Sequence, residues 1–143
     1  MPAPKISRGE QYQGFPYVIL DYPRIFSSAD VFAIRCFFWW GHFFSITLHL
    51  KGKYATQYLH KMQQALAAQQ LNDFWVSVSG SEFNFDLSHP DYVPAASHPK
   101  LLAAVPNRHP FIKLSYRLPF SQWNTVSGQL LEQFQKIKKM LED

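Results

Sequence analysis

The stretch 31–50, VFAIRCFFWWGHFFSITLHL, decides the fold of this 143-residue chain. β-Branched and aromatic residues, which favour strands, fill both of its halves, and the break at 40–42 separates the two. We predict a β-hairpin in which Trp39 pairs with Phe43, because this register makes one face wholly apolar. The apolar face then carries Phe32, Ile34, Cys36, Phe38, Phe44, Ile46, Leu48 and Leu50.

The opposite face of the predicted hairpin is half polar, and folding alone does not explain its composition. Arg35 and His49 become diagonal neighbours on adjacent strands, about 7 Å apart between backbones. An arginine and a histidine among aromatic rings can bind an anionic or aromatic ligand through charge-assisted hydrogen bonds and stacking. This face, called the half-polar face below, carries Ala33, Arg35, Phe37, Trp39, Phe43, Ser45, Thr47 and His49.

The segments before the hairpin predict an arm and one strand. Residues 1–14, rich in proline, glycine and polar groups, indicate an extended N-terminal arm. Residues 17–22 form a β-prone run closed by Pro23, which we expect to be a strand.

Downstream of the hairpin, apolar spacing predicts a helix over 53–70 and a second hairpin over 74–87, turning at Gly80-Ser81. Phe74, Val76 and Val78 should face the core, and Trp75 the other side. Residues 88–110 contain five prolines, so we expect a long loop that could act as a lid, with one short helix over 99–105.

The end of the chain predicts one more strand and helix. Alternation over 111–118 gives a strand, and Ser121 is placed to cap a final helix. Gly128, inside that helix, suggests a close backbone approach to a neighbouring element. The apolar stripe of the helix runs through Trp123, Val126, Leu130, Phe134, Ile137 and Leu141.

These elements predict a single α+β domain over residues 1–143. The antiparallel sheet has about six strands in βββα-βββα order, and two main helices pack on one of its faces. At 47% hydrophobic and 17% charged residues, the chain can bury a core and is not disordered.

Composition also bounds the location and the partners. The most apolar run, 37–44, is far shorter than the ~20 residues of a membrane span, so we expect no membrane partner. The N-terminus lacks a signal peptide and Cys36 is the lone cysteine, which predicts a cytoplasmic protein. The net charge of +4 is spread along the chain, which disfavours nucleic acid as a partner.

The chemistry-bearing residue types show no enzyme signature. Phosphate-loop, nucleophile-elbow and zinc-binding motifs are absent from the sequence, so we expect no cofactor and lean against catalysis. His89, His98 and His109 lack zinc-like spacing, and we predict solvent-facing turn residues rather than a metal site. Cys36 falls on the apolar face, where a thiol is inert.

Three hypotheses follow. The leading one is a non-catalytic binding module that contacts a protein partner or a second copy through its aromatic, half-polar surface. The second is a small-ligand or enzymatic pocket between the sheet and the C-terminal helix, anchored by Arg35 and His49, for an apolar or anionic ligand. The weakest is nucleic-acid binding. The predicted contact residues are Arg35, Phe37, Trp39, Phe43, His49 and Trp75.

Overall fold

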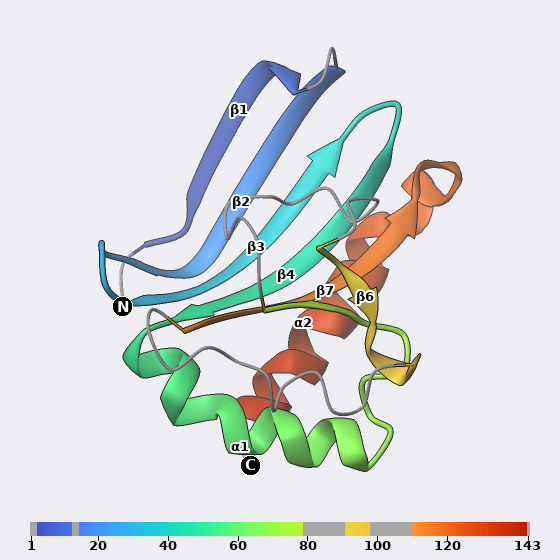
Figure 1. Ribbon diagram of the computed structural model, residues 1–143. Helices are drawn as coiled ribbons and strands as arrows, with labels where there is room; N and C mark the ends of the chain where they lie inside the picture. The colour runs from blue at the N-terminus through green and yellow to red at the C-terminus, as the bar shows by residue number, and fades with distance from the viewer. Residues whose placement is uncertain (1–2, 13–14, 79–90, 98–109, 143) are drawn as a thin grey trace.

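The protein is described by a computed structural model that covers residues 3–12, 15–78, 91–97 and 110–142. An antiparallel seven-stranded sheet, in the order β1-β2-β3-β4-β7-β5-β6, forms one layer. Helices α1 and α2 form a second layer on one face of the sheet (Figure 1). The α+β class and the two helices on one face are therefore confirmed, with one strand more than the six predicted.

The central hairpin has the register that the sequence predicts. Strands β3 (Val31–Trp39) and β4 (Phe43–Lys51) pair with Trp39 opposite Phe43 and Phe32 opposite Leu50. The apolar face of this hairpin packs against α1 (Lys53–Ala67) and α2 (Val126–Glu142), where Leu48 and Leu50 are fully buried. The hydrophobic pattern fixed this register because a slip of one residue would have turned the apolar side chains away from the helices.

The N-terminal arm predicted for residues 1–14 is wrong. Strand β1 (Lys5–Tyr12) pairs with β2 (Phe15–Phe26), which extends beyond the predicted strand 17–22 at both ends. The outer edge of β2 carries backbone donors and acceptors that need partners, and β1 supplies them. As an edge strand, β1 leaves Lys5 and Ile6 exposed, which is why its sequence looks like that of a solvated arm.

The second half of the sheet differs in detail from the prediction. Strand β7 (Phe111–Pro119) matches the predicted strand and pairs with β4 along its full length. Strand β5 (Trp75–Ser77) lies between β7 and the short β6 (Val93–Pro94), which was predicted to be loop. Phe74, Val76 and Val78 face the core as expected. The second half of the predicted hairpin, 82–87, and the predicted helix 99–105 lie outside the described residues.

The C-terminal helix begins later than the Ser121 cap predicts. Residues Phe120–Thr125 form a 3-10 segment, η3, and Gln122 within it has non-helical dihedral angles. The tighter winding of η3 takes Trp123 out of phase with α2, so Trp123 is exposed instead of joining the apolar stripe. The rest of that stripe packs in the core as predicted: Val126, Leu130, Phe134, Ile137 and Leu141.

Two further expectations concern Gly128 and membranes. A Cβ added at Gly128 would meet nothing within 4 Å, so the expected close approach of another element is wrong. In the part of the chain that the structure describes, neither helix combines the length and the apolarity needed to cross a bilayer.

Candidate functional site

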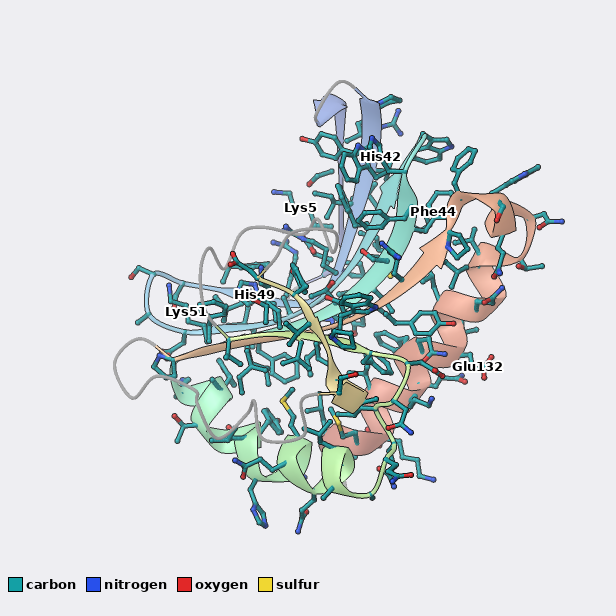
Figure 2. All side chains as sticks on the ribbon, turned by 45° about the vertical axis from the view of Figure 1, so that its right-hand side comes forward. Lys5, His42, Phe44, His49, Lys51 and Glu132 are labelled. Carbon is teal, nitrogen blue, oxygen red and sulfur yellow. The ribbon has the colours of Figure 1, made fainter. Side chains whose placement is uncertain are left out.

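The half-polar face lies on the side of the sheet away from the helices, as His49 shows in Figure 2. Strand pairing extends it from the predicted hairpin across β2, β7 and β5. One row runs across five strands through Asp21, Arg35, Thr47, Ser115 and Trp75. A second row contains His49, Lys113 and Ser77, and a third contains Phe37, Ser45 and Arg117.

Burial on this face is unusual for its composition. Seven of the eight buried polar or charged side chains among the described residues lie here. Lys113 is 0% exposed and His49 is 1% exposed. Each buried polar group needs hydrogen-bond or ion-pair partners, whereas apolar residues would make a stable sheet face without them. The seven residues are Asp21, Ser45, Thr47, His49, Ser77, Lys113 and Ser115.

Arg35 is held by a carboxylate that the sequence analysis did not assign to it. Its guanidinium donates from Nε to Asp21 Oδ1 at 2.7 Å and from Nη2 to Asp21 Oδ2 at 3.0 Å. The same guanidinium lies 5.7 Å from the centre of the Phe26 ring. This bidentate ion pair fixes Arg35 flat on the sheet and uses two of its donors.

The aromatic residues of the half-polar face pack against one another. Phe37, Trp39 and Phe43 form a buried cluster with Tyr92, and Trp75 packs against its edge. The Trp39 and His42 rings stack with centres 3.7 Å apart. Phe37, Trp39, Phe43 and Tyr92 are buried, so these four side chains offer little contact area to a protein partner.

Lys113, Thr47 and Ser115 form the buried centre of the site. Lys113 Nζ lies 5.0 Å from the centre of the Tyr92 ring, in a cation–π contact. The hydroxyls of Thr47 and Ser115 are 2.7 Å apart and share a hydrogen bond. Ser45 Oγ is buried and has no hydrogen-bond partner among the described residues.

Arg117 is the functional candidate that the sequence analysis missed. It lies directly opposite Ser45 on the neighbouring strand, is exposed, and has its guanidinium carbon 5.9 Å from the Phe43 ring centre and 5.8 Å from that of Trp75. No ion pair or hydrogen bond joins its side chain to another described residue. The alternation of 111–118 puts Arg117 on the polar side of its strand, but only the pairing of β7 with β4 places it in this site.

The six predicted contact residues thus lie on one face, with different accessibility. Arg35 and His49 are diagonal neighbours, as expected. They do not line the predicted pocket between sheet and C-terminal helix, because that space borders the opposite face. His89, His98 and His109 lie outside the described residues, and within those described no group of three or more metal-ligating side chains could hold a metal ion.

A groove does exist between the sheet and α2, and most of the side chains that line it are apolar. It consists of two adjoining cavities of about 300 and 350 Å³ that share Tyr22, Ile34 and Phe134. Cys36 lies on its floor, where burial, with a smaller contribution from Asp21, raises the pKa of the thiol to about 11. The remaining wall residues include Leu20, Phe38, Leu130 and Leu131, and we call this the apolar groove.

No protein-family model, curated protein or solved structure matches the chain.

Proposed function

We propose that the chain is a non-catalytic binding module that holds a small anionic ligand with a flat apolar part on the half-polar face. The observation that carries the proposal is the concentration of buried polar side chains on this one face. Buried polar side chains gathered in a single patch are more typical of a functional site than of a sheet face that serves packing alone.

The charge of the face supports an anion. Arg35, Lys113 and Arg117 are basic, whereas Asp21 is the only acidic residue whose side chain is described in the seven strands. Since Asp21 is engaged by Arg35, the exposed Arg117 supplies the positive charge that a ligand can reach. A negative ligand gains from such a field most strongly where water is excluded.

Arg117 provides the accessible anchor. The rings of Phe43 and Trp75 hold its guanidinium in place, so little side-chain entropy remains to be lost when the ligand binds. The planar fork of donors suits a carboxylate or phosphate, and Trp75, which is only partly buried, gives a surface for the flat part of the ligand. Arg35, already bound to Asp21, serves to shape the site.

Thermal unfolding at constant ionic strength tests this proposal, with benzoate as an aromatic anion, benzamide as its neutral analogue and inorganic phosphate as a second anion. At ten times its Kd, benzoate should stabilise the protein by about 1.4 kcal/mol, which is about 3–6 °C in Tm for a chain of this length. Benzamide should have a much smaller effect because it lacks the charge.

The variant Arg117→Gln should weaken benzoate binding at least tenfold, since it removes a charged and bidentate contact. Lys136→Gln is the matched control, because Lys136 is an exposed cation over the Phe74 ring on the helical side of the sheet. The proposal fails if neither anion shifts the Tm of the wild type, or if Arg117→Gln responds to benzoate as the wild type does.

A further inference from the structure

On the helical side of the sheet, β1, β2 and the β3–β4 tip extend beyond α1 and α2 (Figure 1). Five large apolar side chains on this side are between 38% and 67% exposed. Together with the apolar groove they form what we call the exposed apolar patch. Its exposed members are Ile6, Tyr22, Trp40, Phe120 and Leu131.

Contacts place these side chains on one side of the sheet. Ile6 pairs with Leu20, which lines the apolar groove, and Tyr22 and Leu131 line the groove themselves. The Trp40 ring lies 6.3 Å from Phe38 and 6.0 Å from Phe44, between ring centres. The Phe120 ring centre lies 5.7 Å from that of Phe44, which Figure 2 labels beside the end of β7.

We infer that the exposed apolar patch binds a second copy of this chain, so that the protein is a homodimer. The inference is independent of the proposed ligand site, which lies on the other side of the sheet.

The exposed apolar area matches what a dimer of standard size needs. At roughly 200 Å² for a fully exposed large side chain, the five exposures amount to on the order of 500 Å². A standard interface buries about 800 Å² per partner, and homodimer interfaces are about 65% apolar, which also gives about 500 Å². A contiguous apolar patch of this size is at the upper end for the surface of a monomer.

Shape and charge both favour a copy of the same chain. A two-fold interface needs a surface that complements itself, and here the exposed Leu131 lies beside a groove of about 300 Å³. The rim carries both signs, since Lys138 Nζ lies 3.9 Å from Glu142 Oε1. A mixed rim suits a self-complementary partner better than a polyanion such as nucleic acid.

Sedimentation equilibrium of the full chain between about 1 and 200 µM tests the inference, a range chosen for interfaces of standard size. The wild type should pass from the monomer mass to twice that mass. Leu131→Glu and Trp40→Glu each put a charge into the patch and should weaken self-association at least tenfold. Both side chains are already partly exposed, so the fold should survive, and circular dichroism checks this.

Gln57→Glu is the matched control, because it adds the same charge on the exposed surface of α1 and should leave the dimer unchanged. A monomer at every concentration overturns the inference and points to another occupant for the exposed apolar patch. A dimer that survives both Leu131→Glu and Trp40→Glu overturns it as well, since the copies then meet elsewhere. Neither outcome affects the benzoate test.

Discussion

Separating Asp21 from Arg35 should destabilise the protein unequally, depending on which partner is removed. The two side chains form a bidentate ion pair with N–O distances of 2.7 and 3.0 Å. The Asp21 side chain is 5% exposed and the Arg35 side chain is 19% exposed. Arg35→Met leaves the carboxylate buried without its cation. Breaking a buried pair in this way costs about 3–5 kcal/mol, and the partial exposure of Arg35 places our estimate at about 3 kcal/mol.

The reciprocal variant should cost less. In Asp21→Leu the guanidinium keeps its contact with the Phe26 ring and is close enough to solvent to regain water. We expect a loss of about 1–2 kcal/mol. The double variant replaces the pair by apolar side chains of similar volume and should lie within about 1 kcal/mol of the wild type. The coupling energy is therefore about 3–5 kcal/mol.

Urea unfolding followed by circular dichroism measures all four free energies of unfolding. The slope of the free energy of unfolding against urea concentration should not differ between variants, because the same fold exposes the same surface on unfolding. Equal costs for the two single variants, or a double variant less stable than either, would show that the buried carboxylate is not the source of the penalty.

Two further predictions concern α2 and the apolar groove. Gly128→Ala should raise the free energy of unfolding by about 0.5–1 kcal/mol, because the new Cβ meets nothing within 4 Å and alanine favours the helix; a lower Tm would reveal a contact at this position. The folded Cys36 thiol, with its pKa raised to about 11, keeps its proton at pH values where the unfolded chain, with a pKa near 9.0, loses it. The wild type should therefore match Cys36→Val in its pH dependence below pH 9 and lose about 1 kcal/mol per pH unit relative to that variant above it; parallel urea curves at pH 8, 9 and 10 would contradict this.

Local pattern predicted the parts of the fold whose two faces differ sharply. In the hairpin 31–50, the predicted register brings Phe32, Ile34 and Cys36 to the same side as Leu48, which a slip of one residue would not, and the structure has that register. The prediction failed at β1, since an edge strand exposed on both faces has the composition of a solvated arm. It failed also at Trp123, because a 3-10 segment changes the helical phase before α2 begins.

The sequence predicted only part of the candidate site, namely Trp75 and the residues that lie on the central hairpin. Alternation within the hairpin put Arg35 and His49 on one face, because neighbours on paired strands are fixed by register. The carboxylate of Asp21 and the guanidinium of Arg117 come from strands on either side of that hairpin. Strand order across a sheet depends on how whole elements pack, and alternation within one strand carries no information about it.

The sequence by itself therefore determined the two faces of the central hairpin, the helices that cover one face, and the α+β class. All three follow from the periodic placement of apolar residues, which acts within a few residues along the chain. Only the tertiary structure decided which strands flank the hairpin, how deeply Lys113 and His49 are buried, and where an apolar groove remains open. Those features depend on contacts between residues far apart in sequence, where the free energy of packing several elements together selects one arrangement.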